Sequence, residues 1–222
     1  MSGRAHLRRI RAIIFDLDGV LVDSEPAHHA ATLRLVAPNV VTDAEYARFV
    51  GASVESFAGW VRERFAMQTS IEDIIERYDD LVTEQLVALK LPPLDGAVEL
   101  LDTIRQREVP VAVASQSQPR WVYTTLDGAG LVSHIDIVVA ADAVTRAKPQ
   151  PDIYLHTASL LDIAPEACLA VEDSVPGVQA AHTAGMFVVQ TRQASSAVPP
   201  QPGAHAVIAS LRDFDLGWLA AK

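Results

Sequence analysis

The fold is decided by the first apolar stretch of the chain, which reads Ala12-Ile13-Ile14-Phe15-Asp16-Leu17-Asp18-Gly19-Val20-Leu21-Val22-Asp23-Ser24. Its first four residues show no polar alternation, which is typical of a parallel strand buried on both faces. Asp16 follows directly, at the carboxyl end of the predicted strand, where open α/β sheets bind their ligands. Asp16 and Asp18 can point the same way, and Gly19 permits a sharp departure of the backbone. Taken alone, the stretch also fits a pair of turn aspartates.

Five further apolar runs predict the remaining strands of the same sheet: Val109–Ala114, Ile135–Ala140, Cys168–Val171, Phe187–Gln190 and Ala206–Ile208. Polar or glycine-containing segments and helical stretches separate these runs. Alternation of strands and helices is typical of a parallel sheet with helices on both faces. We therefore predict an α/β core, a doubly wound, Rossmann-like parallel sheet.

One region breaks the alternation, because no strand pattern occurs from Ser24 to about Lys90. In its second half, apolar residues recur at spacings of three and four, as on one face of a helix: Ile71, Ile74, Ile75, Tyr78, Leu81, Val82, Leu86 and Leu89. Ser70 can cap this helix, and Pro92-Pro93 ends the helical region. We predict two domains, an α/β core of residues 1–22 and 93–222 and an inserted all-α cap of residues 23–92.

Composition narrows the classes of protein and of partner. The 222 residues are 50% hydrophobic and 21% charged, which is typical of a globular chain. The formal net charge of −10 argues against nucleic acid as a partner, since phosphate backbones would be repelled. The single cysteine, Cys168, excludes an intrachain disulfide framework and a cysteine-based zinc site.

The chain offers no apolar run near the ~20 residues of a membrane span, so we expect no membrane partner. Arg4, Arg8, Arg9 and Arg11 make the start of the chain basic, but the apolar run after them is too short for a signal peptide. We interpret this start as a solvated tail and predict a cytoplasmic protein.

Other polar residues follow the later strands in chain order, and they are Ser115, Lys148, Glu172 and Asp173. The carboxyl ends of parallel strands meet at one edge of a sheet, so we expect these groups to gather around Asp16 and Asp18. Carboxylates at close range resist ionisation unless a cation compensates them, and hard oxygen ligands suit Mg²⁺. A phosphate would complete the site, held by the lysine, the serine hydroxyl and the N-terminus of the following helix.

These residues resemble, in order and spacing, the four motifs of the haloacid dehalogenase superfamily of phosphotransferases. Asp16–Glu25 resembles motif one, Ser115 and Lys148 stand at motifs two and three, and Val171–Ala181 resembles motif four. The resemblance covers nearly the whole chain. It is to the subgroup with a helical cap between the first strand and the rest of the core, and within it to the β-phosphoglucomutase and sugar-phosphate phosphatase branch.

The resemblance implies a role for each motif residue. Asp16 would be the nucleophile that forms an aspartyl-phosphate, and Asp18 the general acid and base. Mg²⁺ would be bound by the Asp16 carboxylate, the backbone carbonyl of Asp18 and Asp173, with Glu172 bound directly or through water. Ser115 and Lys148 would bind the transferring phosphoryl group. For Lys148, a structural ion pair to Glu172 or Asp173 is the alternative.

Further candidates are less specific. His28 matches a position where relatives often carry a histidine that faces the active site, whereas we expect His29 to be a surface residue. Gly51 begins a Gly-Ala-Ser segment similar to a cap loop that reaches over the substrate. Gln116 and Ser117 follow motif two and could donate to phosphate, with a local turn or helix cap as the alternative. We predict a Mg²⁺-dependent phosphatase, active as a monomer on a small phosphorylated metabolite of the sugar-phosphate class.

A β-phosphoglucomutase-type hexose-phosphate mutase is the alternative function. A mutase holds a bisphosphate in two orientations and needs a cationic clamp for the distal phosphate. Val54 stands where the family mutase has its cation, and Pro119 where it has an asparagine. Arg120 or Arg62 could substitute for the missing clamp. A dehalogenase or a non-catalytic binding protein fits the motifs less well, because every motif residue is present.

Overall fold

The computed structural model describes residues 10–49 and 53–219. The chain forms two compact units, one made of the segments before Ser24 and after Leu91, and one made of Ser24–Leu91. No helix within the described ranges is both long and apolar enough to cross a membrane.

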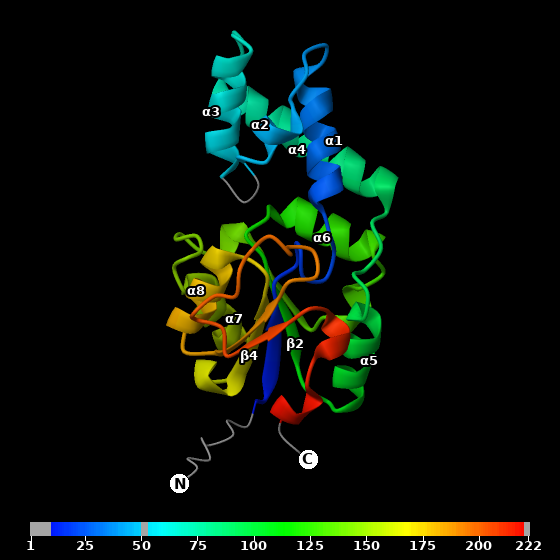
Figure 1. Ribbon diagram of the computed structural model, residues 1–222, viewed down its shortest axis with the longest axis vertical. Helices are drawn as coiled ribbons and strands as arrows, with labels where there is room; N and C mark the ends of the chain where they lie inside the picture. The colour runs from blue at the N-terminus through cyan, green and yellow to red at the C-terminus, as the bar shows by residue number, and fades with distance from the viewer. Residues whose placement is uncertain (1–9, 50–52, 220–222) are drawn as a thin grey trace. The chain divides into compact units, whose positions relative to one another are not determined.

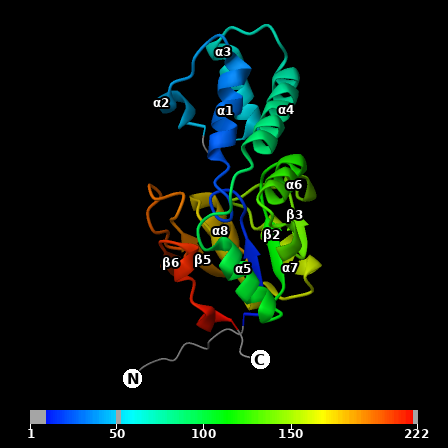
Figure 2. The same cartoon turned by 90° about the vertical axis from the view of Figure 1, so that its right-hand side faces the viewer.

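The first unit is built on one parallel sheet of six strands in the order β3-β2-β1-β4-β5-β6 (Figures 1 and 2). The strands are β1 (Ala12–Phe15), β2 (Val111–Ala114), β3 (Ile137–Val139), β4 (Cys168–Glu172), β5 (Phe187–Thr191) and β6 (Ala206–Ile208). Every neighbouring pair is parallel. The predicted doubly wound sheet is therefore confirmed.

Strands β2 and β3 each begin two residues later than predicted. Pro110 has no N–H to give to a ladder, although its carbonyl accepts from Ile13 at 3.0 Å. The Asp136 carboxylate accepts the N–H of Val111 at 2.8 Å. A side chain thus takes the place of the backbone partner that we expected at the start of β3.

Four longer helices belong to this unit: α5 (Ala97–Gln106), α6 (Pro119–Gly128), α7 (Asp152–Leu160) and α8 (Val175–Thr183). Helices α7 and α8 lie on one side of the sheet and α5 on the other (Figure 1). Short 3₁₀ turns complete the unit: η1 (Val132–His134), η2 (Ala141–Ala143), η3 (Pro165–Ala167), η4 (Leu211–Asp213) and η5 (Leu216–Trp218).

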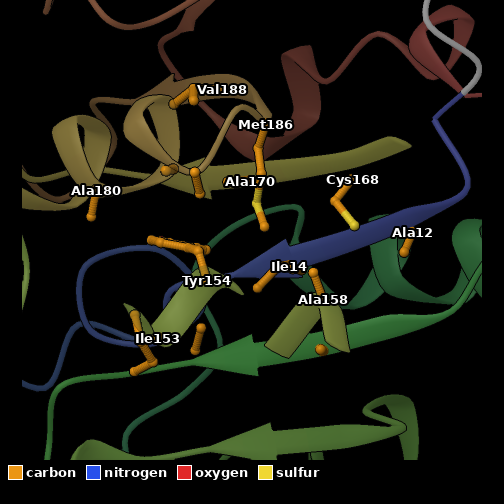
Figure 3. Close-up of a cluster of buried hydrophobic side chains, with 14 of the residues drawn as sticks. Ala12, Ile14, Ile153, Tyr154, Ala158, Cys168, Ala170, Ala180, Met186 and Val188 are labelled. Carbon is orange, nitrogen blue, oxygen red and sulfur yellow. The ribbon is translucent and has the colours of Figure 1, made fainter. Parts of the chain in front are cut away.

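The core between the sheet and helices α7 and α8 combines small and large side chains (Figure 3). Ala112 and Ala170 flank Ile14 on the neighbouring strands, in register with it. Tyr154 of α7 is fully buried in this cluster. Alanines on the strands leave room for a ring of this size, so the helix can approach the sheet closely.

The second unit consists of α1 (Glu25–Val36), α2 (Asp43–Tyr46), α3 (Val54–Arg64) and α4 (Ile71–Leu89). Helix α4 has the predicted bounds, and the Ser70 hydroxyl accepts the N–H of Asp73 at 3.0 Å as its N-cap. Helices α1 and α3 both pack against α4. The rings of Phe57 and Tyr78 pack in this interface at 4.8 Å between ring centres. Among the described residues the unit is entirely helical, as predicted.

The chain leaves the sheet-bearing unit and returns to it at adjacent points. Val22 forms an antiparallel bridge with Pro93, and the N–H of Leu94 donates to the carbonyl of Leu21 at 2.8 Å. An insertion whose ends already lie together adds little loop-closure entropy, which is why a helical unit fits after the first strand.

Candidate active site

Asp16 extends the ladder of β1 by one residue beyond the strand. Its N–H donates to the carbonyl of Val171 at 2.9 Å, which fixes the backbone at the carboxyl edge of the sheet. The chain then turns sharply at Gly19, whose φ is +78° and whose N–H donates to Val22 at 2.8 Å. A Cβ on Gly19 would overlap the carboxylate of Asp173. Glycine therefore serves both the turn and the close approach of the second acid.

Lys148 links the ends of three strands through its ammonium group. Nζ donates to Asp16 Oδ1 at 2.6 Å, to Glu172 Oε1 at 2.6 Å and to the carbonyl of Ala114 at 3.1 Å. The three contacts match the three N–H donors of an ammonium. The side chain is only 4% exposed, so these ion pairs are shielded from solvent. The Tyr154 ring lies 5.0 Å from Nζ and completes the enclosure.

Glu172 is the most extensively hydrogen-bonded of the acids. Its Oε1 accepts from Lys148 and from the Tyr154 hydroxyl, the latter at 2.7 Å. Its Oε2 accepts from the N–H groups of Asp173 and Ser174 and from the Ser174 hydroxyl, at 3.1–3.3 Å. Because both oxygens already have several partners, the geometry favours Glu172 as the anchor of Lys148 over a direct metal ligand.

The close approach of helix α8 to this acid also depends on a glycine. A Cβ on Gly177 would overlap the Glu172 carboxyl group. The hydroxyl of Ser174 caps the same helix by accepting the N–H of Gly177 at 3.1 Å. Helix α8 therefore begins directly against the buried carboxylate.

Asp18 is held by two serine hydroxyls. Its Oδ2 accepts from Ser117 at 2.7 Å and from Ser115 at 3.2 Å, and the N–H of Ser117 donates back to Ser115 Oγ at 3.0 Å. The structure thus brings Ser115 to the predicted site. The second candidate after motif two, Ser117, contacts Asp18 as well, whereas the neighbouring Gln116 is exposed.

A group of three carboxylates could hold a metal ion. Oxygens of Asp16, Glu172 and Asp173, one from each, lie within 4.8 Å of one another, and all three residues are buried. One ammonium cannot balance three such charges, and hard oxygen donors suit Mg²⁺. The residues present therefore fit the predicted ion. The Asp18 side chain lies outside this group, in keeping with the prediction that only its backbone carbonyl would contribute.

Burial and the crowding of charged groups shift the pKa values of three side chains of the site. Burial, together with the neighbouring carboxylates, raises the pKa of Asp16 well above its usual range, although Lys148 opposes the effect. Burial and the charge of Glu172 raise the pKa of Asp173 to about 6, against the lowering effect of a hydrogen bond from Ser195. Burial alone would lower the pKa of Lys148, but the charges of Asp16 and Glu172 outweigh it and raise that pKa.

The other predicted residues belong to the inserted segment of the chain. His28 belongs to the helical unit, where its Nδ1 lies 3.2 Å from the Tyr78 hydroxyl. His29 contacts the Tyr46 ring with 4.6 Å between ring centres, so it takes part in the packing of that unit as well. Gly51 lies outside the described residues. The roles of these residues toward a substrate remain predictions.

Two residues were missed as members of the site: Tyr154 and Ser195. Tyr154 lies within a largely apolar helix, where a tyrosine is expected to be an ordinary core residue. Ser195 lies in a stretch rich in serine and proline, a composition that indicates a loop but not its contacts.

Comparison with known proteins identifies the family. Residues 10–185 match the family model of haloacid dehalogenase-like hydrolases. The chain belongs to this family. It is therefore an enzyme of the hydrolase class, as predicted.

Named relatives of this hydrolase differ in activity and in length. Validoxylamine A 7'-phosphate phosphatase from Streptomyces hygroscopicus subsp. limoneus is 30% identical, over 81% of this chain and 84% of that protein. Beta-phosphoglucomutase from Bacillus subtilis is 28% identical, over 95% and 94%. The Arabidopsis thaliana protein SUPPRESSOR OF QUENCHING 1 is 31% identical over 83% of this chain, which spans only 18% of that longer protein.

Solved structures support the fold of this hydrolase. CbbY from Rhodobacter sphaeroides, crystallised with phosphate, matches with a TM-score of 0.83 over 95% of this chain and 99% of that chain. The sequence identity is 24%, so the match concerns the fold alone.

We expect Asp173→Asn to stabilise the metal-free protein in a pH-dependent way. An acid whose pKa rises on folding binds more protons in the native state, so its ionisation destabilises the fold as pH rises from about 3.8 to about 6. A shift of about two units corresponds to about 3 kcal/mol. In EDTA, the variant should therefore unfold with a larger free energy than the parent at pH 7.5, and with nearly the same one at pH 4.

Urea unfolding at both pH values measures this difference. Asp127→Asn, an exposed aspartate of helix α6, is the matched control and should show no pH-dependent gain. A loss of stability in Asp173→Asn at pH 7.5, or a difference independent of pH, would contradict the interpretation.

Proposed function

We propose that this hydrolase is a Mg²⁺-dependent phosphatase of a small phosphorylated metabolite of the sugar-phosphate class. The observation that carries the proposal is the buried ammonium of Lys148, 2.6 Å from Asp16 Oδ1, at an edge crowded with carboxylates. It places a positive charge beside the proposed nucleophile, where the oxygens of a phosphoryl group would arrive. The name of the Streptomyces relative supports a small phosphorylated metabolite as the substrate.

The proposed reaction proceeds in two displacements at Asp16. A carboxylate oxygen of Asp16 forms a bond to phosphorus as the bond between phosphorus and the leaving oxygen breaks. Asp18 donates its proton to that leaving oxygen. Water then attacks the aspartyl-phosphate, Asp18 takes a proton from the water, and inorganic phosphate is released while the Asp16 carboxylate is restored. Ser115 and Ser117 hold the Asp18 carboxyl group in place for both transfers.

Within this proposal, Asp16, Asp173 and the backbone carbonyl of Asp18 would hold Mg²⁺, with Glu172 reached through water because both of its oxygens already accept hydrogen bonds. The bound ion would neutralise the acids and absorb charge on the phosphoryl oxygens. Lys148 and Glu172 form a fixed pair whose ammonium offsets the charge of Asp16. Lys148 and Ser115 would hold the phosphoryl group.

In the same proposal, the helical unit, with boundaries at residues 23–92, is the cap that selects the substrate. His28 and Gly51 would contribute to the substrate site from this unit, and Gln116 would contribute from the loop after β2. A cytoplasmic location and a monomeric state are part of the same proposal. The acidic balance of the chain is consistent with a small-molecule substrate and not with nucleic acid.

A mutase is the second candidate, favoured by the similarity to the Bacillus beta-phosphoglucomutase over nearly the whole of both chains. Against it stand the residues where a distal phosphate would need a cation. Val54 begins α3 and Pro119 begins α6, and neither can pair with an anion. Without a clamp, a bisphosphate would dissociate and water would complete the reaction.

Asp16→Asn tests the nucleophile. The substitution keeps the shape of the side chain but removes the anionic oxygen that would attack phosphorus. Phosphate release from a panel of sugar phosphates, glycolate phosphate and nucleotides, measured with Mg²⁺, should fall to background, and the far-ultraviolet circular dichroism should be unchanged. Asp127→Asn is the matched control. Turnover above a few per cent of the parent would overturn the role of Asp16, and parental activity unaffected by EDTA would overturn the metal.

Asp18→Asn tests the proton transfer. A poor leaving group needs a proton as its bond breaks, whereas an activated aryl phosphate needs less help. General acid catalysis contributes about 10²–10⁴-fold, so a sugar phosphate should lose far more activity than p-nitrophenyl phosphate. Ser117→Ala, which removes one hydrogen bond to Asp18, should show the same bias at smaller size. Equal losses for both substrates would argue against an acid role in the first step.

A coupled assay separates the phosphatase from the mutase. β-Glucose 1-phosphate is supplied with Mg²⁺ and a bisphosphate activator, and glucose 6-phosphate and inorganic phosphate are measured in the same sample. Because no cation stands at Val54 or Pro119, we expect phosphate release without detectable isomerisation. Isomerisation faster than phosphate release would establish the mutase, and Arg120→Ala and Arg62→Ala would then identify the clamp.

A further inference from the structure

The segment after β5, which its composition predicts to be a surface loop, is fixed by buried and half-buried side chains. Gln190, at the end of β5, has no exposed surface. Its Oε1 accepts the N–H of Gln201 at 2.8 Å, and its Nε2 donates to the carbonyl of Pro199 at 3.2 Å. Arg192 donates through Nε to the carbonyl of Val198 at 2.8 Å. The returning limb of the loop is therefore tied to the strand from which it departs.

The other end of the loop is anchored as well. Gln193 donates through Nε2 to the carbonyl of Asp95 at 3.0 Å, and its Oε1 accepts the N–H of Leu211 at 3.0 Å. Both of these partners belong to the same unit as the sheet. The residues between Gln193 and Val198 thus lie between two sets of fixed hydrogen bonds, which limits how far they can move.

This fixed loop brings Ser195 to the proposed metal site. The Ser195 hydroxyl donates a hydrogen bond to Asp173 Oδ2. The same oxygen lies close to the backbone of Gly19, where no side chain intervenes. Several hydrogen bonds hold the Glu172 carboxylate, whereas the described residues give the Asp173 carboxylate no comparable set. The orientation of Asp173 therefore depends chiefly on its contacts with Ser195 and Gly19.

We infer that Ser195 is a positioning residue, which orients the Asp173 carboxylate for Mg²⁺ and is held in place by the loop of residues 192–201. The inference rests on the metal site of the proposed function. Hydrogen bonds from outside a ligand set fix the orientation of the ligands, and their loss typically weakens metal binding by about 10–100-fold. Ser195 would touch neither the substrate nor the ion, and its effect would pass through Asp173.

The test measures metal binding directly, with Mn²⁺ as the probe. Mn²⁺ takes the same oxygen ligands as Mg²⁺, and free Mn²⁺ can be counted by its six-line electron paramagnetic resonance signal. The full chain is titrated as the parent, as Ser195→Ala, as Ser195→Thr and as Ser196→Ala. Ser196 is the matched control, since its contact to Arg192 is made by its backbone carbonyl. Asp173→Asn is added to report on the metal site itself.

We expect Ser195→Ala to raise the Mn²⁺ dissociation constant about tenfold or more. Ser195→Thr, which keeps a hydroxyl, should restore it to within about threefold, and Ser196→Ala should leave it unchanged. Unfolding of metal-free Ser195→Ala at the temperature of the parent would exclude a merely structural role.

Three results would overturn the inference, and they can be told apart. Unchanged binding in Ser195→Ala with impaired binding in Asp173→Asn would refute the role of Ser195 and leave the proposed function standing. Unchanged binding in both variants would refute the metal site, and the inference would fail with it. Weakened binding in Ser196→Ala equal to that in Ser195→Ala would assign the effect to the loop as a whole and not to the hydroxyl.

Discussion

The ion pairs of Lys148 are the interaction on which the rest of the site depends. One buried ammonium contacts Asp16 and Glu172 at 2.6 Å each, in a place almost closed to solvent. Removing charges from water costs several kcal/mol per ion, and the cost is offset only where further hydrogen bonds satisfy every group. The Tyr154 hydroxyl and the N-terminus of helix α8 provide those bonds at Glu172. The buried Tyr154 of α7 and the start of α8 therefore both help to hold the Lys148 ammonium beside Asp16.

The order of the sheet explains how residues so distant in the chain come to share one site. Strand β1 lies at the centre, with β2 on one side and β4 on the other. Their carboxyl ends therefore place Ser115 and Glu172 on either side of Asp16, although about 100 and about 156 residues separate them along the chain. Lys148 reaches the same edge from the connection after β3 and donates to β2 as well as to both acids. A ligand edge of this kind forms only when the whole sheet has folded.

Much of this was predictable, because the signals are local. Each strand is a short apolar run, and a polar residue directly after such a run must lie at the carboxyl edge, so the amino-acid sequence alone suffices to place the motif residues there. What escaped prediction depends on contacts across the fold. Tyr154 has no signature that distinguishes it from other core residues of its helix, and its hydroxyl gains a role only because it reaches Glu172 at the end of β4. Ser195 is one of several serines in a stretch whose composition indicates nothing of its contacts. Strands β2 and β3 are shorter than predicted because Pro110 has no N–H to donate and because the Asp136 side chain accepts the N–H of Val111.

Glu172 and Asp173 are neighbours in the chain, but their surroundings give the two carboxylates different roles. Glu172 is the last residue of β4, accepts hydrogen bonds at both oxygens and is neutralised by Lys148. Asp173 lies one residue beyond the strand, and burial beside Glu172 raises its pKa to about 6. Loss of the Glu172 charge would leave a buried ammonium with a missing partner, whereas loss of the Asp173 charge would relieve repulsion. The first acid therefore contributes to the fold, and the second opposes it unless a cation is bound. Two carboxylates in different surroundings can serve different roles, and here the acid whose charge opposes folding, Asp173, is the one that a bound cation would stabilise most.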